Sequence, residues 1–238
     1  MSDLVGFIQK ISIYAVPVIF AITFHEAAHG YVAFKKGDPT AYMLGRVTLN
    51  PLPHIDPVGT ILFPLALILM GSGVVLGWAK PVPVNFRLLR DHKWDPIYVA
   101  SAGVVTNLAL AALAGIVFRF LILYDPGIMG FVETFLKVGK VDTGGAIFRM
   151  VTIPLALMCF VFVFVNVVLA VFNLIPVPPL DGGRIAVGLL PYRASMALAS
   201  VERYGMLIIV LLVVLGEHGP LRIIGRLVWE LSLFFLGL

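Results

Sequence analysis

Three long apolar stretches constrain the fold of this chain more than any other feature. They lie near residues 5–34, 96–123 and 150–173. Each is long enough to cross the roughly 30 Å hydrocarbon core of a bilayer, which takes about 20 helical residues. Because backbone inside lipid must satisfy its own hydrogen bonds, such segments are expected to be helices. With 60% hydrophobic and 13% charged residues, the chain is predicted to be an all-α polytopic membrane protein, a helical transmembrane bundle.

Three further apolar stretches are shorter or interrupted. Residues 58–78 are long enough to cross, but a proline and a Gly-Ser-Gly break divide them, and residues 204–216 are short. The last stretch, residues 221–238, carries polar residues that recur every four positions: Arg222, Arg226 and Glu230. A polar stripe of this kind is typical of an interfacial or protein-packed helix and not of a lipid-exposed span.

Charge placement predicts the orientation of the chain. Lys and Arg accumulate in short cytoplasmic loops, and basic residues follow the first stretch, the 58–78 stretch and the 150–173 stretch. Residues 124–149 balance basic against acidic side chains and are predicted to be external. Because both flanks of 58–78 are basic, this segment is expected to be re-entrant, dipping into the membrane and returning on the same side.

The net charge of +4 follows from the same loops. In a membrane protein, an excess of this size normally belongs to cytoplasmic loops, so no nucleic-acid partner is inferred. The basic loop 79–95 is interpreted as a face attracted to anionic lipid. The single cysteine, Cys159, lies in an apolar run and is assigned to packing.

Two histidines and a glutamate interrupt the first apolar stretch, in the sequence His25-Glu26-Ala27-Ala28-His29. Residues four apart lie above one another on one helix face, so His25 and His29 can present imidazole nitrogens to one ion at about 2.0–2.1 Å. Glu26 lies beside that face. From there its carboxylate could take a proton from a zinc-bound water, whose pKa the metal lowers to roughly 7. The motif therefore supplies two zinc ligands and a general base.

A catalytic zinc site normally has three protein ligands and one position open for water. The 150–173 stretch ends in Asn173, and three prolines then precede Leu180-Asp181-Gly182-Gly183. Three prolines and two glycines are expected to unwind the helix there. Broken backbone at membrane depth is tolerated where it is buried in protein or lines a water-filled cavity. Asp181 is the predicted third ligand, and Asn173 is assigned to polar contacts with the broken backbone.

These motifs resemble a known family. HExxH in the first helix and NxxPxPxLDG in a later one are similar to the site-2 protease family of intramembrane zinc metalloproteases, peptidase family M50. The stretches GRVTLNPLPHIDPVGT, residues 45–60, and GWAKPVPVN, residues 77–85, resemble the short members that lack a PDZ domain. Together the similar segments cover most of residues 20–190.

The resemblance implies a role for each residue of the site. His25, His29 and Asp181 would hold one zinc ion per chain, and Glu26 would act as the base. Asn107 would help to hold the substrate or the developing oxyanion. Family members commonly carry proline after the Ala-Gly pair that precedes this asparagine, whereas this chain has valine there. The implied activity is hydrolysis of peptide bonds within or near transmembrane helices of membrane proteins, as in regulated intramembrane proteolysis.

The polar segment 37–57 is too polar to span a membrane and too rich in Gly and Pro to form one helix. Within it, Arg46–Leu49 are expected to form a short membrane-associated strand, whose edge could pair with an extended peptide. His54 and Asp56 lie between prolines. They are assigned to turns and hydrogen bonds and not to a metal.

The chain is predicted to form a single transmembrane metalloprotease domain over residues 1–238, with a core at 5–190 and accessory helices at 194–238. It is placed in the cell membrane as a multi-pass protein whose active site opens to the cytoplasmic side. Two other functions stay open: a catalytically silent scaffold that binds membrane helices, and a transporter that moves a metal ion past intramembrane His and Asp. The intact ligand set argues against the scaffold, and a glutamate beside paired histidines fits hydrolysis better than transport.

Overall fold

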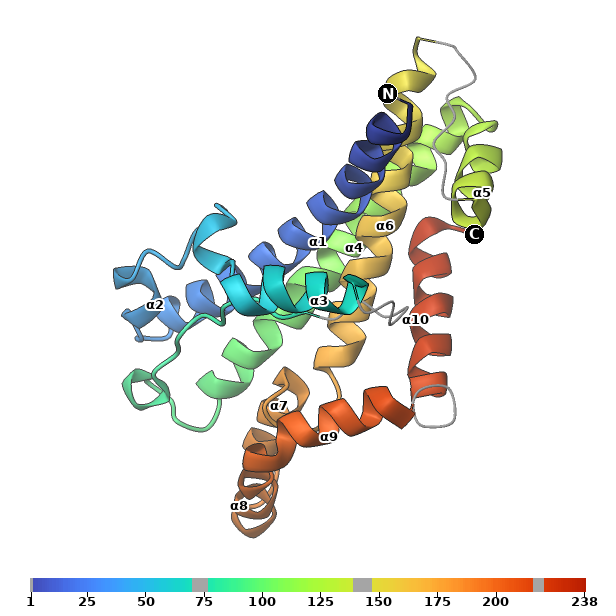
Figure 1. Ribbon diagram of the computed structural model, residues 1–238. Helices are drawn as coiled ribbons and strands as arrows, with labels where there is room; N and C mark the ends of the chain where they lie inside the picture. Colours follow the sequence, from blue (N-terminus) through green and yellow to red (C-terminus); the bar gives the residue numbers. More distant parts are fainter. Residues whose placement is uncertain (1, 70–76, 139–146, 216–220) are drawn as a thin grey trace. The chain divides into compact units, whose positions relative to one another are not determined.

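The computed structural model describes residues 2–69, 77–138, 147–215 and 221–238 (Figure 1). The chain forms two compact units. The first unit contains the chain up to Ala21, Asn107–Ile175 and Arg203–Leu238, and the second contains Ile22–Thr106 and Pro176–Glu202. Helices α1 and α4 each contribute residues to both units, and each unit is described by itself below.

Three helices of the described chain are long and apolar enough to cross a membrane. The candidate spans are Ile11–Lys35 in α1 (Ser2–Lys35), Asp95–Tyr124, which is α4, and Arg149–Asn173, which is α6. The three long apolar stretches predicted from the sequence are therefore confirmed as helices. Helix α9 (Glu202–Leu215) has 14 residues and α10 (Leu221–Leu236) has 16, so both are shorter than a full span.

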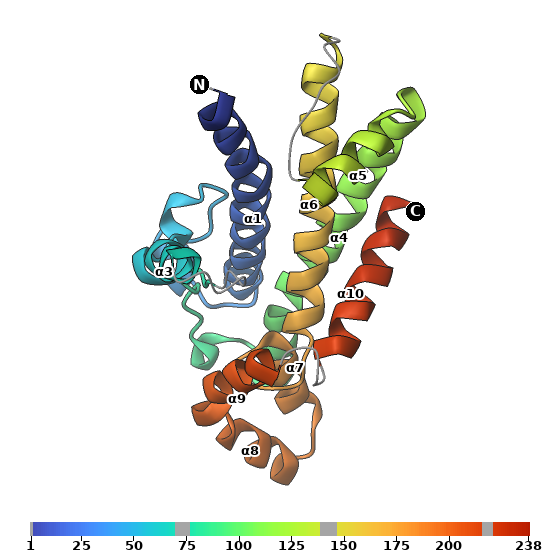
Figure 2. The ribbon, with the colours of Figure 1, turned by 45° about the vertical axis from the view of Figure 1, so that its right-hand side comes forward.

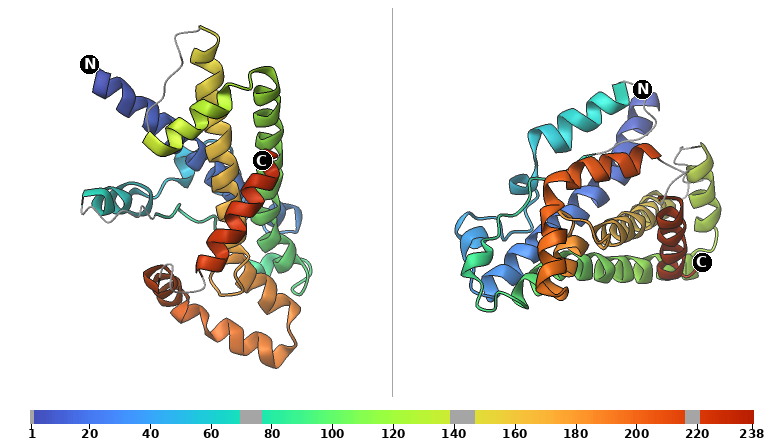
Figure 3. Two further views of the ribbon diagram at one scale, coloured as in Figure 1. Left: turned by 90° about the vertical axis from the view of Figure 1, so that its right-hand side faces the viewer. Right: turned by 90° about the horizontal axis from the view of Figure 1, so that it is seen from below.

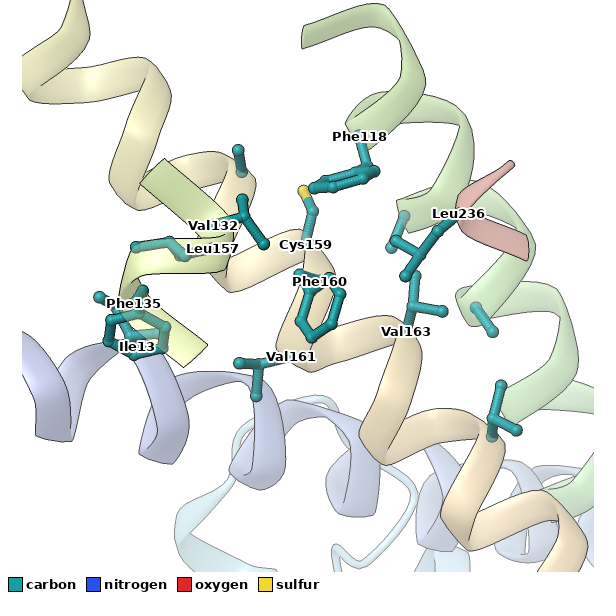
Figure 4. Packing of buried hydrophobic residues seen from close by; sticks show 14 of the residues in the cluster. Ile13, Phe118, Val132, Phe135, Leu157, Cys159, Phe160, Val161, Val163 and Leu236 are labelled. Carbon is teal, nitrogen blue, oxygen red and sulfur yellow. The ribbon is translucent and has the colours of Figure 1, made fainter. Parts of the chain in front are cut away.

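The first unit has a hydrophobic core centred on α6. Helix α5 (Ile128–Val138) and α10 both pack against α6, and the views in Figures 2 and 3 show α10 running along it. Figure 4 shows buried side chains that point into this core from each helix: Ile13 from α1, Phe118 from α4, Val132 and Phe135 from α5, Leu157 and Phe160 from α6, and Leu236 from α10. The last helix is therefore packed against protein, as its polar stripe indicated.

Helix α5 lies in the segment that the sequence analysis treated only as an external loop. Ile128, Val132 and Phe135 recur at helical spacing and are fully or almost fully buried. Asp125 and Arg149 flank the segment, and their side chains form an ion pair with an Nε–Oδ2 distance of 2.7 Å. Buried contacts with α6 thus stabilise α5, in a segment whose polar composition had suggested a loop.

The second unit is built from short elements around the ends of α1 and α4. They are α2 (Thr40–Met43), the 3-10 helices η1 (Leu52–His54) and η3 (Phe86–Leu88), the π-helix η2 (Pro57–Leu62), α3 (Phe63–Leu69), α7 (Asp181–Leu189) and α8 (Tyr192–Ser200). An ion pair between Lys36 Nζ and Asp95 Oδ1, at 2.9 Å, joins the end of α1 to the start of α4.

The strand expected at Arg46–Leu49 is not found, and no strand occurs in the part of the chain that the structure describes. Residues 47–49 form successive bends. Side chains hold this segment instead of a partner strand: the Arg46 guanidinium donates to the Lys80 carbonyl at 2.6 Å, and the His54 ring contacts the Thr48 carbonyl at 3.0 Å. The hydrogen-bonding role predicted for His54 is thereby confirmed.

The segment predicted to be re-entrant is described only in part, because residues 70–76 lie outside the described chain. Residues 57–69 are helical, in η2 and α3. The two ends of the segment meet: Trp78 N–H donates to the Gly59 carbonyl at 3.1 Å, and the Thr60 hydroxyl donates to the Trp78 carbonyl at 2.8 Å. Asp56 accepts from the amides of residues 58 and 59 at the start of η2, which confirms the turn role predicted for it.

The chain breaks after α6, as the prolines predicted, but the glycines behave differently from the prediction. Residues 174–180 form bends and turns. Asp181 is the first residue of α7, and Gly182 and Gly183 lie buried in the first turn of that helix. The Asn173 side chain donates to the Leu169 carbonyl at 2.9 Å, one turn earlier within α6, and its predicted contact with the broken backbone stays a prediction. The prolines alone therefore end the helix, and the glycines allow close packing of the next one.

Candidate metal centre

Three side chains from distant parts of the sequence converge in the second unit. His25 and His29 come from successive turns of α1, and their Nε2 atoms are 3.1 Å apart. The Asp181 Oδ2 atom lies 3.4 Å from His25 Nε2 and 3.3 Å from His29 Nε2. Both histidines are less than a tenth exposed. Among the described residues, this is the one group of His, Cys, Asp or Glu side chains arranged to hold a metal ion.

The donor atoms fit a zinc ion. Ligands about 2.0–2.1 Å from one ion in a tetrahedral arrangement lie roughly 3.3–3.4 Å from one another, and the three separations in this site are close to that value. Asp181 Oδ2 is buried and makes no hydrogen bond with any described residue. A buried acceptor without a hydrogen bond is unfavourable by itself, so this oxygen fits the role of a metal ligand. Two imidazoles and one carboxylate also match the chemistry of a catalytic zinc site.

The backbone of α4 fixes the tautomer of one histidine. His29 Nδ1 lies 2.7 Å from the Val99 carbonyl oxygen. A carbonyl only accepts, so Nδ1 carries the proton and donates it, and Nε2 keeps the lone pair that a metal needs. Val99 is buried, and the contact joins residues 70 positions apart in the sequence. The start of α4 therefore sets both the orientation and the protonation of the ligand on α1.

Gly103, one turn further along α4, gives the two imidazoles their space. A Cβ atom at this position would lie 2.5 Å from His29 Nε2 and 2.6 Å from His25 Nδ1. Real side chains do not tolerate such distances, so any larger residue would displace the histidines. No local sequence pattern marks this glycine as part of the site.

Close backbone packing also places Asp181. A Cβ atom on Gly183 would collide with the backbone nitrogen of Pro178, so the first turn of α7 rests directly on the loop before it. The first turn of α7 thereby brings the Asp181 Oδ2 atom within 3.4 Å of both imidazole Nε2 atoms.

Glu26 lies next to the converging ligands on α1 and has a backbone partner of its own. Its Oε2 atom accepts a hydrogen bond from the Val82 N–H at 2.7 Å. Asn107 is fully buried on α4 and follows Gly103 by four residues, so the two share a helix face. Asn107 belongs to the first unit and the converging ligands to the second, and its role stays a prediction.

A groove runs along another face of α1 in the second unit. It has a volume of about 360 Å³, and one wall is the bend segment 47–49. The opposite wall is made by side chains of α1: Phe24, Ala27, Ala28 and Tyr31. The groove therefore lies beside the helix that carries the histidines, and it is lined mainly by apolar groups.

Long apolar helices and a histidine–histidine–aspartate centre with a neighbouring glutamate define a membrane metalloprotease. The model of Peptidase family M50 matches residues 13–216, and the chain belongs to this family. Zinc is accordingly its metal cofactor, and the lipid bilayer is its environment.

Curated relatives carry names of the same kind. Over 205 residues the chain is 38% identical to "Putative zinc metalloprotease YwhC" from Bacillus subtilis, which covers 85% of this chain and 81% of that protein. Over 198 residues it is 27% identical to "Putative zinc metalloprotease Rip2" from Mycolicibacterium smegmatis, covering 82% of this chain and 64% of the relative. The Mycobacterium tuberculosis H37Rv protein of that name is 25% identical over 194 residues. No solved structure matches the chain significantly.

Proposed function

We propose that this protein is a site-2-type intramembrane protease that hydrolyses peptide bonds within or near transmembrane helices of other membrane proteins. The observation that carries the proposal is the convergence of His25, His29 and Asp181 at tetrahedral spacing beside Glu26. The pair of histidines lies on a helix that is long and apolar enough to cross a membrane. A hydrolytic site on such a helix is suited to substrates that reach it from the bilayer.

Each residue has a proposed part in hydrolysis. His25, His29 and Asp181 would hold the zinc ion, which would acidify a bound water and polarise the scissile carbonyl. Glu26 takes the proton from the attacking water and delivers it to the leaving amine. Asn107 holds the substrate or the developing oxyanion through its side-chain amide. These roles are those expected of an HExxH hydrolase with aspartate as the third metal ligand.

The groove beside α1 is the proposed binding place for unwound substrate. A peptide bond inside a regular helix is shielded, so a substrate helix must open before cleavage. The 47–49 segment is held by side-chain contacts and forms no strand, and its residues line the groove. We propose that it offers backbone hydrogen bonds to an extended peptide without being part of a sheet.

The proposed topology is that of one multi-pass membrane domain over residues 1–238, whose active site opens to the cytoplasm. Basic residues at 79–95 and after α6 support a cytoplasmic location of these segments. The hydrogen bonds that join Trp78 to Gly59 and Thr60 support a re-entrant path for residues 58–78, because they bring both ends of the segment to the same place.

The test combines zinc content with cleavage of a model single-span substrate in detergent or liposomes. We expect about one zinc per chain in the wild type and in Glu26→Gln and clearly less in Asp181→Ala, with cleavage by the wild type and by neither of these two variants. Glu133→Gln is the matched control, because Glu133 is exposed on α5 and pairs only loosely with Lys137. If the wild type binds zinc but cleaves nothing, the result would favour a scaffold function. If Glu26→Gln cleaves at the wild-type rate, the proposed role of Glu26 as general base would be contradicted.

A further inference from the structure

We propose that residues 80–85, called the strap below, are a positioning element that aims the carboxylate of Glu26 through the backbone N–H of Val82. The proposal deepens the proposed function and rests on it. The strap lies in the second unit, as do Glu26 and the three converging ligands. It has the sequence Lys-Pro-Val-Pro-Val-Asn, and it follows the segment proposed to be re-entrant.

The sequence of the strap leaves one amide available at the point of contact. Proline has no N–H, so in Pro81-Val82-Pro83 only Val82 can donate a backbone hydrogen bond. That bond goes to Glu26 Oε2 at 2.7 Å. Hydrogen bonds to an ionised carboxylate are short and about twice as strong as neutral ones. The flanking prolines also restrict the backbone to extended conformations, which limits the directions in which the N–H can point.

Buried charged side chains hold both ends of the strap. The Arg46 guanidinium donates to the Lys80 carbonyl at 2.6 Å, and Lys80 N–H donates to the His54 carbonyl at 2.9 Å. At the other end, Asn85 N–H donates to Asp38 Oδ2 at 2.6 Å. Asp38 is completely buried and Arg46 is 7% exposed.

Such burial makes the anchoring strong. Buried charges are costly unless they are paired or hydrogen-bonded, and here Arg46 and Asp38 bind backbone groups of the strap. The side chains therefore fix the path of the strap on both sides of Val82. A chain held at two ends and stiffened by prolines between them has little freedom to move its central amide.

Gly30 lets the strap approach α1 closely. A Cβ atom at Gly30 would lie 3.1 Å from Val82 Cγ1 and 3.0 Å from Val47 Cγ2. Gly30 follows Glu26 by four residues, so both lie on the face of α1 that meets the strap. Val82 is itself 9% exposed, and its hydrogen bond to Glu26 is partly buried.

The contact has a chemical consequence. A glutamate side chain has several rotatable bonds, and a base must point at the proton that it takes. The Val82 N–H holds one carboxylate oxygen, which orients the other for proton transfer. Val82 is thus a positioning residue: its amide acts through Glu26 and touches no reacting atom.

The decisive comparison is Val82→Pro with Val82→Ala in the full-length, zinc-loaded protein. Val82→Pro deletes the N–H and keeps an extended backbone, whereas Val82→Ala trims the side chain and keeps the N–H. We expect kcat for the model substrate to fall on the order of 10- to 100-fold in Val82→Pro, with KM and zinc content close to those of the wild type. Val82→Ala should retain kcat within about threefold.

A spectroscopic measurement tests the contact apart from activity. In zinc-free protein labelled with ¹⁵N-valine, the Val82 resonance is identified by its loss in Val82→Ala. Because a short bond to a carboxylate deshields the amide proton, we expect this resonance to move upfield in Glu26→Gln. An unmoved Val82 resonance would overturn the contact, whatever the activity of the protein.

The outcomes separate the two proposals. A wild type that binds zinc but cleaves nothing contradicts the proposed function, and the amide resonance still decides the contact. If Val82→Pro cleaves the model substrate at the same rate as Val82→Ala, the positioning role is overturned. If Val82→Pro cleaves faster than the wild type, the strap restrains Glu26 instead of aiming it. If Val82→Pro fails to fold, Arg46→Gln replaces it: a loosened strap should lower kcat with zinc retained, and unchanged kcat overturns the proposal.

Discussion

Gly103 on α4 lies directly against His29 on α1, at a distance that leaves no room for a side chain. A Cβ atom at position 103 would come within 2.5 Å of the His29 Nε2 atom, which is a proposed zinc donor. The neighbouring Val99 carbonyl holds the other nitrogen of the same ring at 2.7 Å. One face of α4 therefore both positions the imidazole and limits the space around its metal-binding atom.

Replacing Gly103 with alanine should weaken zinc binding. The added methyl group must push the His25 and His29 rings away from the positions at which their Nε2 atoms converge with Asp181. We expect the apparent zinc affinity to fall at least tenfold, equivalent to about 1.4 kcal/mol, as measured by competition with a chelator. Gly130→Ala on α5 is the control, because a Cβ there meets nothing within 4 Å. Equal affinities of the two variants would contradict the steric argument.

Replacing Gly183 with alanine should damage the site from the side of Asp181. The new methyl group would overlap the backbone of Pro178, so the first turn of α7 must move and carry Asp181 with it. Overpacking of this kind typically costs about 1–3 kcal/mol. We expect a lower thermal unfolding temperature in detergent and a lower zinc content. Gly225→Ala on α10 has open space at its Cβ and should change neither quantity.

Local patterns explain which parts of the site could be predicted. His25, Glu26 and His29 share successive turns of one helix, so their geometry follows from spacing alone. Asp181 could be predicted because it lies in a proline-rich break of an apolar stretch. Broken backbone at membrane depth is tolerated mainly where it is buried in protein or lines a water-filled cavity. Gly103 carries no comparable local signal, because its importance comes from a contact with residues far away in the sequence.

Secondary structure could likewise be predicted only where a local sequence pattern marks it. Length and hydropathy predicted the three long helices, whereas α5 was missed because its segment is bounded by polar residues. The spacing of Ile128, Val132 and Phe135 is the signal that would have found it. The strand at 46–49 was predicted from its composition, but a strand needs a partner, and here the side chains of Arg46 and His54 hold the segment instead.

The ion pair between Asp125 and Arg149 should make stability depend on acid pH. Hydrogen bonds from Arg149 hold the pKa of the Asp125 carboxyl below its ordinary value. Because the pKa of Asp125 is lowered in the folded state, the ion pair's contribution to the free energy of unfolding is fully present above the ordinary pKa of about 3.9. This contribution is lost as pH falls through the lower pKa of the folded state. The difference in unfolding temperature between the wild type and Asp125→Asn should therefore shrink below about pH 4.

Zinc loss at low pH would obscure this effect, because protonated histidines do not bind metal. The comparison is therefore best made in an Asp181→Ala background, in which both proteins lack the proposed third ligand. A difference between the two proteins that stays constant from pH 7 to pH 3 would show that the ion pair does not stabilise the fold.

Single cysteines should report the proposed topology, with Cys159→Ala as the background because Cys159 is the single cysteine of the chain. Cysteines at Met43, Arg87 and Lys137 replace exposed side chains. If residues 58–78 return to the side they leave, the cysteines at 43 and 87 share one side of the membrane, and the one at 137 lies on the other. In intact cells an impermeant maleimide should therefore label position 137 alone. Labelling at 87 without labelling at 43 would mean that residues 58–78 cross completely, which contradicts the re-entrant path.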